Sequence, residues 1–273
     1  MKKEPLLFAV IGKPLGHSLS PKMHNAAFKA KKINAVYFAL ETDKAKDAIG
    51  LMKALGIKGY SVTIPLKETA LHLMDSVEPL AKRIGAINTV VNRNGRLYGY
   101  NTDCFGAISA LEEKISLKGK NALVLGAGGA AKAIAFGLKQ KKAKVAIANR
   151  TFSRAKSLAK KIGGKAVALK SMKSLEGFDV LVNATSIGMH PKTSTMPLNA
   201  SLLHKKLLVF DIIYNPLETK LLREARRKGC KTVNGVKMFV EQGEKQFELF
   251  TGKNAPKKLM ERVVLMELKK GKK

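Results

Sequence analysis

The 273-residue sequence has no tryptophan, only two cysteines, and no apolar run longer than a strand. With only 5 tyrosines as well, it offers few aromatic surfaces on which single-stranded nucleic acid could stack. Cys104 and Cys230 lack metal-ligand spacing and a neighbouring histidine, so we expect two inert, partly buried thiols and no metal site. A transmembrane helix needs about 20 apolar residues. We therefore expect no targeting or membrane-spanning segment and a cytoplasmic protein.

Acidic residues are also scarce, because 51 lysines and arginines outnumber 20 aspartates and glutamates, giving a net charge of +31. Such a charge can indicate a nucleic-acid or anionic membrane partner. The lysines are, however, spread along the whole chain and are not interleaved with aromatic residues. We interpret them as a solvated surface that attracts an anionic substrate and cofactor, with neither nucleic acid nor membrane as a partner.

Short apolar runs alternate along the chain with amphipathic stretches of helical length, which is typical of parallel βαβ units. Asn94-Gly95 between two apolar pairs predicts a hairpin, and Ser20 before Pro21 predicts a helix N-cap. The expected strands are 6–11, 36–40, 59–64, 165–169, 180–183, 207–213 and 232–234, and the expected helices are 21–31, 44–55, 67–73, 104–114, 154–162, 219–228, 238–251 and 256–269.

A glycine-rich turn between the apolar run 121–125 and a helical stretch predicts a dinucleotide site. Gly126, Gly128 and Ala131 form a G-x-G-x-x-A motif. Gly126 permits the tight turn, Gly128 lets backbone N–H groups approach a pyrophosphate, and Ala131 allows close helix–strand packing. The pyrophosphate would then meet the positive end of the helix dipole. The alternative interpretation is an ordinary glycine-rich turn of an α/β domain.

The residue that follows the next apolar run indicates which dinucleotide binds. An NAD site would have an acidic residue there for the ribose 2′-hydroxyl, whereas this sequence has Arg150. A guanidinium can pair with a 2′-phosphate, and Arg154 and the hydroxyl of Thr151 are close by in sequence. We therefore predict NADP(H) as the cofactor.

The length exceeds that of a typical single core, and 45% of the residues are hydrophobic, so we expect two domains. The predicted fold is α/β, with an NADP-binding Rossmann-type domain at 104–237. Residues 1–103, joined by the returning terminal helices 238–273, would form a substrate-binding (catalytic) domain. No Gly/Ser-rich linker separates them, which favours hinge closure over a cleft.

Polar side chains gather in the loops of the expected first domain. Ser18 and Ser20 follow its first strand, Lys67 follows a later one, and Asn88 and Asp103 lie in further loops. Each taken alone could be a helix cap, a turn residue or a solvated charge. Together their hydroxyl, ammonium, amide and carboxylate groups suit a small polyhydroxylated carboxylate.

Eight motifs occur along the chain in the following order: S-L-S-P at 18–21, V-T-I-P-L-K at 62–67, G-A-I-N-T at 85–89, N-T-D at 101–103, G-A-G-G-A at 126–130, N-R-T at 149–151, N-A-T-S at 183–186, and Gln242. With these motifs the sequence resembles the shikimate dehydrogenase family from residue 6 to about residue 250. The resemblance implies NADPH-dependent, reversible reduction of 3-dehydroshikimate to shikimate, in the biosynthesis of chorismate and aromatic amino acids. Two departures are Ser61, where the family commonly has asparagine, and Ile212, where it often has methionine.

The resemblance also implies roles for individual residues. Lys67 would be the general acid/base, paired with Asp103. The implied substrate-binding residues are Ser18, Ser20, Thr63, Lys67, Asn88, Asp103, Tyr214 and Gln242. The implied cofactor-binding residues are Gly126, Ala127, Gly128, Gly129, Ala130, Asn149, Arg150, Thr151, Arg154, Thr185, Ile212 and Gly235.

Three alternatives remain open at this point. A quinate/shikimate dehydrogenase would accept an extra hydroxyl and often NAD, but Arg150 and the pair Ser18 and Ser20 favour the strict enzyme. A methylenetetrahydrofolate dehydrogenase would not explain that serine pair. A basic NADP-sensing or nucleic-acid-binding module would explain the charge but would not need Lys67 with Asp103. The oligomeric state, monomer or homodimer, is left undecided.

Overall fold

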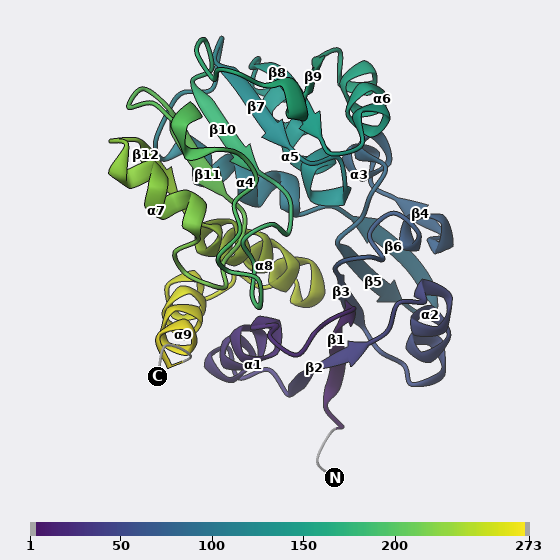
Figure 1. The fold of residues 1–273 in the computed structure, drawn as a ribbon. Helices are drawn as coiled ribbons and strands as arrows, with labels where there is room; N and C mark the ends of the chain where they lie inside the picture. Colours follow the sequence, from purple (N-terminus) through teal and green to yellow (C-terminus); the bar gives the residue numbers. More distant parts are fainter. Residues whose placement is uncertain (1–3, 271–273) are drawn as a thin grey trace. The chain divides into compact units, whose positions relative to one another are not determined.

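The computed structural model describes residues 4–270, which fall into two compact units (Figure 1). Unit 1 comprises the chain up to Thr102 and from Val240 onward, and unit 2 comprises Asp103–Phe239. Each unit is built on a six-stranded sheet, which confirms the predicted α/β class. Within residues 4–270, no helix combines the length and the apolar character needed to cross a membrane.

The sheet of unit 1 is mixed, with the order β2-β1-β3-β5-β6-β4. Strands β1 to β3 are parallel, and β5 runs antiparallel to both β3 and β6. The predicted hairpin turn between β5 and β6 is confirmed, since Asn94 and Gly95 both have positive φ, at 53° and 87°. The strands are β1 (Leu6–Gly12), β2 (Ala35–Glu41), β3 (Gly59–Val62), β4 (Ser76–Val77), β5 (Thr89–Arg93) and β6 (Arg96–Tyr100).

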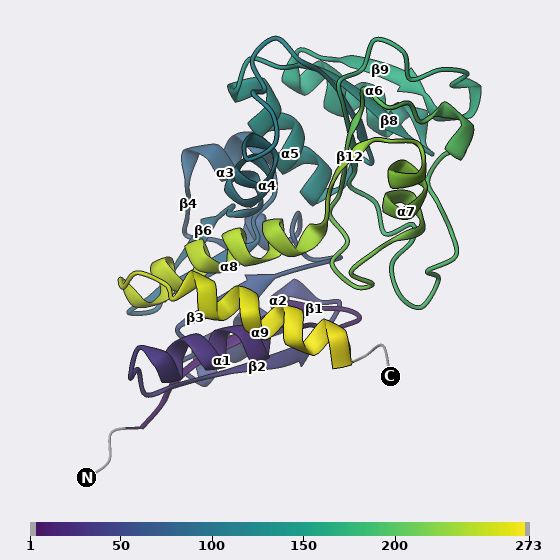
Figure 2. The same ribbon diagram turned by 90° about the vertical axis from the view of Figure 1, so that its left-hand side faces the viewer.

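Helices cover both faces of this sheet. On one face α1 (Ser20–Ala30) and α8 (Gly235–Thr251) pack around Phe8, whose ring lies 5.2 Å from Phe28 and 5.1 Å from Phe250, and α9 (Lys257–Lys270) follows α8. Helices α1 and α9 lie side by side (Figure 2). On the other face α2 (Ala45–Ala54) and the 3₁₀ helix η1 (Ala70–Leu73) enclose a second apolar cluster. A short helix, α3 (Pro79–Ile84), precedes β5.

Two local predictions in unit 1 are wrong. Ser20 is the first residue of α1 and not its N-cap, and the Ser18 hydroxyl instead accepts the Ser20 N–H at 3.4 Å. The helix predicted over 67–73 is reduced to η1. The Lys67 carbonyl accepts the N–H of Ile87 at 2.9 Å, so this acceptor is used between segments and not within a helix.

The sheet of unit 2 is fully parallel, with the order β12-β11-β10-β7-β8-β9. The chain winds outward from β7 to β9, then returns beside β7 to form β10. This reversal is the topological switch point at which open parallel sheets bind ligands. The elements are α4 (Asp103–Glu112), β7 (Asn121–Leu125), α5 (Gly129–Gln140), β8 (Lys144–Asn149), α6 (Phe152–Ile162), β9 (Lys165–Ala168), η2 (Leu169–Ser171), β10 (Val180–Asn183), η3 (Ala200–Leu202), β11 (Leu208–Asp211), α7 (Lys220–Arg227) and β12 (Lys231–Val233).

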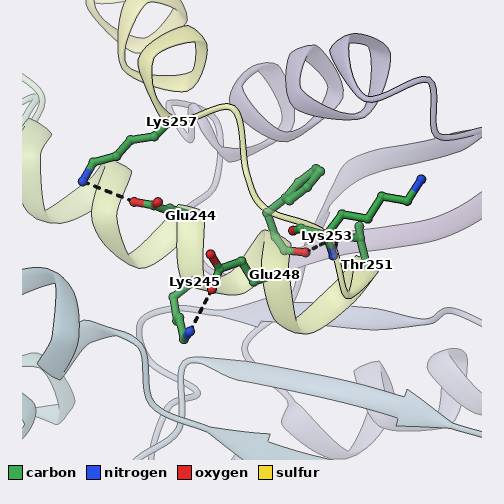
Figure 3. A network of polar contacts seen from close by, with 7 residues as sticks. Glu244, Lys245, Glu248, Thr251, Lys253 and Lys257 are labelled. Carbon is green, nitrogen blue, oxygen red and sulfur yellow. Dashed lines mark hydrogen bonds and ion pairs between the residues drawn. The ribbon is translucent and has the colours of Figure 1, made fainter.

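Ion pairs hold the turn between α8 and α9 in unit 1. The Lys257 ammonium, at the start of α9, lies 2.6 Å from the Glu241 carboxylate and 3.3 Å from that of Glu244 (Figure 3). The side chain of Glu241 is only 4% exposed. Lys245 pairs with Glu248, three positions further along α8, at 2.7 Å (Figure 3). Lys257 is therefore a cation that compensates the buried Glu241 carboxylate.

Replacing Lys257 with methionine should destabilise the protein by about 2 kcal/mol, because it keeps the aliphatic stem and leaves Glu241 without this cation. The estimate is below that for a fully buried pair because the Lys257 side chain is 36% exposed. Urea unfolding measures the change as a shift in midpoint at constant slope. Lys253→Met, at an exposed residue of the same turn (Figure 3), is the matched control. Equal losses in the two variants would contradict the proposed role.

Candidate functional site

The polar loops predicted from the sequence meet at one edge of the unit 1 sheet. Strands β1 and β3 are parallel and end together, with Ile11 beside Val62. Strand β5 begins there because it runs antiparallel to β3, pairing Ser61 with Thr89. The segments that follow β1 and β3 and precede β5 therefore converge, and they carry Ser18, Ser20, Thr63, Lys67 and Asn88.

The serine loop after β1 is held by one main-chain bond and by one bond to the Glu41 side chain. The N–H of Ser18 donates to the Leu15 carbonyl at 2.8 Å, and the N–H of Leu15 donates to the Glu41 carboxylate at 2.8 Å. Ser18 is half-buried and Ser20 is buried. Two hydroxyl groups are thus fixed at the start of α1, where the helix N-terminus also favours an anion.

Lys67 is anchored to the same edge through main-chain bonds. The Thr63 N–H donates to the Ile11 carbonyl at 2.9 Å, and the Leu66 N–H closes a turn onto the Thr63 carbonyl at 2.8 Å. The Ile87 N–H then donates to the Lys67 carbonyl at 2.9 Å. This last bond places the Lys67 backbone beside the residue that precedes Asn88. The Lys67 side chain is half-buried.

Asn88 and Gln242, which are 154 positions apart, are brought into contact. The Asn88 Oδ1 accepts the N–H of Thr102 at 2.8 Å, and its Nδ2 donates to the Gln242 Oε1 at 3.3 Å. Both side chains are buried. Two predicted substrate ligands thus form one amide pair at the sheet edge.

Asp103 and Tyr214 belong to unit 2. Asp103 is buried and is the first residue of α4, where a carboxylate is favoured by the helix dipole. Tyr214 is half-buried and stacks on Phe239, with ring centroids 4.4 Å apart. The backbone just before Asp103 is fixed by the bond between Thr102 and Asn88.

The predicted cofactor residues lie at a single edge of the unit 2 sheet. All six strands are parallel, so their carboxyl ends share that edge. The residues at or after the strand ends are Gly126 to Ala130 after β7, Asn149 as the last residue of β8 with Arg150 to Arg154 after it, Thr185 after β10, Ile212 to Tyr214 after β11, and Gly235 after β12. The sheet thereby groups residues that are up to 109 positions apart.

The glycine turn fits a pyrophosphate for reasons visible in its geometry. Gly126 has φ of +116°, and a Cβ there would lie 2.8 Å from the Ala184 carbonyl oxygen, so the fold itself requires glycine. Gly128 has φ of −85°, and a Cβ there would meet nothing within 4 Å. The fold itself would therefore accept a side chain at Gly128, whereas a ligand that approaches the backbone there would not. Ala131 is fully buried, as close packing of α5 demands.

Basic side chains follow β8 at the same edge. Arg150 and Arg154 are exposed, and the Arg154 N–H donates to the Thr151 carbonyl at 3.1 Å. The side-chain amide of Asn149 donates to the same carbonyl at 3.1 Å. The turn that carries Arg150 is thus ordered from both sides, and no acidic side chain occupies the strand end. This arrangement fits a 2′-phosphate.

Sequence reasoning did not assign a role to Asp211, which organises the cofactor side of unit 2. Its fully buried carboxylate accepts bonds from the Ile213 N–H at 3.1 Å, the Thr219 hydroxyl at 2.8 Å and the Asn183 amide at 3.1 Å. Burial raises the pKa of Asp211 to about 6, although these bonds oppose the shift. In the sequence, the sign of such a role was an aspartate inside an apolar run. Through its bond to the Ile213 N–H, Asp211 fixes the turn that carries Ile212.

Two further contacts shape the same region. Asn183 Oδ1 accepts the hydroxyl of Thr185 at 2.7 Å. A Cβ at Gly235 would lie 2.1 Å from the Ile212 carbonyl oxygen, so this position requires glycine. Within residues 4–270, no group of three or more His, Cys, Asp or Glu side chains could hold a metal ion.

Known protein families match segments of both units. The substrate-binding domain of shikimate dehydrogenase matches residues 10–90, a shikimate/quinate 5-dehydrogenase domain matches 109–220, and a shikimate 5′-dehydrogenase C-terminal domain matches 235–265. The NADP⁺ shikimate dehydrogenase of Methanosarcina acetivorans is 46% identical over 276 residues, which cover 96% of this chain and 98% of that protein. The chain belongs to the shikimate dehydrogenase family.

Other proteins with shikimate dehydrogenase domains are similar to this chain in structure or in sequence. A crystal structure of the Thermus thermophilus shikimate 5-dehydrogenase with NADP(H) and shikimate superimposes with a TM-score of 0.88 at 42% identity, covering 96% of this chain and 99% of that one. A bifunctional 3-dehydroquinate dehydratase/shikimate dehydrogenase of Arabidopsis thaliana is 46% identical over 93% of this chain. The chain spans 45% of that longer protein.

Proposed function

We propose that the protein catalyses the NADP-dependent interconversion of 3-dehydroshikimate and shikimate, as a cytoplasmic enzyme of chorismate and aromatic amino-acid biosynthesis. The observation that carries this proposal is the identity of 46% to an NADP⁺ shikimate dehydrogenase over nearly the full length of both chains. The two sheet edges supply polar groups that suit this substrate and this cofactor. We further propose that residues 1–103 with 238–273 bind the substrate and 104–237 bind NADP(H), in a monomer or homodimer.

The proposed cofactor site uses residues of unit 2 alone. The backbone of residues 126–130, at the N-terminus of α5, would hold the pyrophosphate, and Arg150 with Thr151 and Arg154 would hold the 2′-phosphate. The segments that carry Thr185, Ile212 and Gly235 would complete the site. When bound, NADP(H) would supply or accept the hydride.

Lys67 is the proposed general acid/base. In the direction of carbonyl reduction, the carbonyl oxygen gains negative charge, and the Lys67 ammonium would stabilise that charge and deliver a proton to it. Asp103 would hold Lys67 in place and share its proton during the reaction. General acid catalysis of this kind contributes about 10²–10⁴ in rate.

The other polar groups of the unit 1 edge would select the substrate. Ser18 and Ser20, at the start of α1, would bind its carboxylate. Thr63, Asn88 and Gln242 would bind the ring hydroxyls, and Tyr214 would contribute from unit 2. These groups are hydrogen-bonding, so an analogue that leaves them unpaired would bind less well.

One assay tests the proposed function directly. Reduction of NADP⁺ is followed at 340 nm with shikimate and with quinate, and both series are repeated with NAD⁺. We expect turnover of shikimate with NADP⁺ and little with the other three combinations. Comparable turnover of quinate, or with NAD⁺, would instead identify a quinate/shikimate dehydrogenase. No turnover with any pair would refute the proposal.

Arg150→Ala should raise the KM for NADPH about 10–100-fold and leave the KM for NADH within about twofold. The reason is that a charge-assisted contact to a phosphate contributes about 1.5–3 kcal/mol, and NADH has no 2′-phosphate. Steady-state kinetics with both cofactors measures the difference. Arg223→Ala, at an exposed position of α7, should change neither value. Equal losses for the two cofactors would contradict the assignment of Arg150.

A further inference from the structure

A continuous line of buried hydrogen bonds crosses unit 1 from Tyr37 to Gln246. The Tyr37 hydroxyl bonds to Ser61 Oγ at 2.5 Å, and Ser61 Oγ bonds to Gln246 Oε1 at 2.6 Å. The amide nitrogen of Gln246 donates to the Asn88 carbonyl at 3.0 Å and to the Thr89 hydroxyl at 3.1 Å. All five residues are at most 5% exposed. The line connects the outer strand β2 to the edge where Asn88 lies.

The direction of these bonds follows from the Gln246 end. The Tyr37 phenol donates to Ser61 Oγ, because the single proton of the Ser61 hydroxyl is used toward Gln246. At that end, a peptide carbonyl can only accept, so Gln246 must turn its amide nitrogen toward Asn88. Its Oε1 therefore faces Ser61, whose hydroxyl has one proton and donates it there. No member of the line can reverse without leaving a buried group unsatisfied.

The orientation continues into the substrate edge. The Asn88 Oδ1 accepts from Thr102 N–H, a group that can only donate, and from the Thr89 hydroxyl. The Asn88 Nδ2 consequently faces the Gln242 Oε1 and donates to it at 3.3 Å. The carbonyl end of the Gln242 amide is thereby directed toward Asn88, and its nitrogen end is the donor that Gln242 can offer to a substrate oxygen.

Gln246 also couples the position of Gln242 to the sheet. Both residues lie on α8, four positions apart and thus on the same face of the helix. Gln246 bonds to the main chain at the start of β5, and Gln242 bonds to the side chain at the same place. The Gln246 bond therefore helps to position the face of α8 that carries Gln242 relative to Asn88.

We propose that Gln246 and Ser61 are positioning residues of the substrate site: they orient the amides of Asn88 and Gln242 so that Gln242 presents a donor to a ring hydroxyl. This inference rests on the proposed function, in which Asn88 and Gln242 bind the substrate. Neither positioning residue needs to touch the substrate. Ser61 thus has a defined task at a position where the family commonly has asparagine.

The test compares Gln246→Met and Ser61→Ala with wild-type protein. Gln246→Met preserves side-chain length and removes the amide, and Ser61→Ala removes one hydroxyl. We expect Gln246→Met to raise the KM for shikimate about tenfold, Ser61→Ala to raise it about threefold to fivefold, and both to leave the KM for NADP⁺ within about twofold. The Kd for shikimate, measured by calorimetry, should rise by the same factors.

Tyr60→Phe is the matched control, because the Tyr60 hydroxyl is equally buried in unit 1 but donates to the Ala48 carbonyl, outside the line. It should lower stability without changing the KM for shikimate. An unchanged KM for shikimate in Ser61→Ala, or an equal rise in both KM values, would overturn the inference even if Gln246→Met failed to fold. Wild-type protein that turns over no shikimate would instead overturn the proposed function, and this inference with it.

Discussion

Lys67→Ala should lower kcat about 10²–10⁴-fold while the KM for shikimate changes little. The expected loss is large because alanine can neither protonate the developing oxyanion nor stabilise its charge. The KM should be nearly unchanged because the serine loop and the amide pair of Asn88 and Gln242 remain to bind the ground state. An effect confined to kcat is the signature of an interaction made in the transition state.

Initial rates over a range of shikimate concentrations at saturating NADP⁺ measure both constants. Lys82→Ala, at an exposed lysine on α3, is the control for loss of one positive charge from unit 1. Because Asp103 is proposed to act through Lys67, adding Asp103→Asn to Lys67→Ala should lower kcat little further. A Lys67→Ala variant with near wild-type kcat would remove Lys67 from the mechanism.

The parallel strands of unit 2 could be predicted from the sequence almost to the residue. Strand β10 coincides with the predicted 180–183 and is buried along its whole length. The more exposed β9 ends one residue before the predicted 165–169. Strands buried on both faces appear as continuous apolar runs, which makes them conspicuous. The run 207–213 ends early as β11 at Asp211, because that carboxylate binds the next turn through the Ile213 N–H. In the sequence this end is marked by a single aspartate within an apolar run.

The short elements of unit 1 could not be predicted in the same way. Strand β4 has two residues and α3 has six, too few to show a period. The contacts of the candidate site were also hidden, because Asn88 and Gln242 are 154 positions apart and meet only once α8 packs on the sheet. Motifs indicated which residues to consider. Strand direction and register determined which of them share an edge.

The environment of His24 could not be predicted from its place in α1 either. Its ring is fully buried and stacks on Tyr37, with centroids 4.5 Å apart and planes 8° apart. Among the described residues, neither ring nitrogen has a hydrogen-bond partner. Burial lowers the pKa of His24 to about 3, opposed by the nearby Gln246 amide, which is already engaged with Ser61 and Asn88.

This depressed pKa should make the folded protein sensitive to acid. In the unfolded chain, a histidine has its ordinary pKa of about 6.5, so that state binds the proton first as the pH falls. Stability is therefore complete above about pH 6.5, decreases between about 6.5 and 3, and loses no more through this group below about 3. At 1.36 kcal/mol per pH unit, His24 should cost about 3 kcal/mol at pH 4.5.

His24→Leu should abolish this part of the pH dependence. Leucine is of similar size, cannot be protonated and buries no unsatisfied nitrogen, so the variant should be at least as stable as wild type at pH 7.5 and about 3 kcal/mol more stable at pH 4.5. Urea unfolding at both pH values gives the two free energies, and their difference cancels any constant change in packing. His72→Leu, at an exposed position in η1, should retain the wild-type difference. If His24→Leu also retained it, His24 would not be the group responsible for the acid sensitivity.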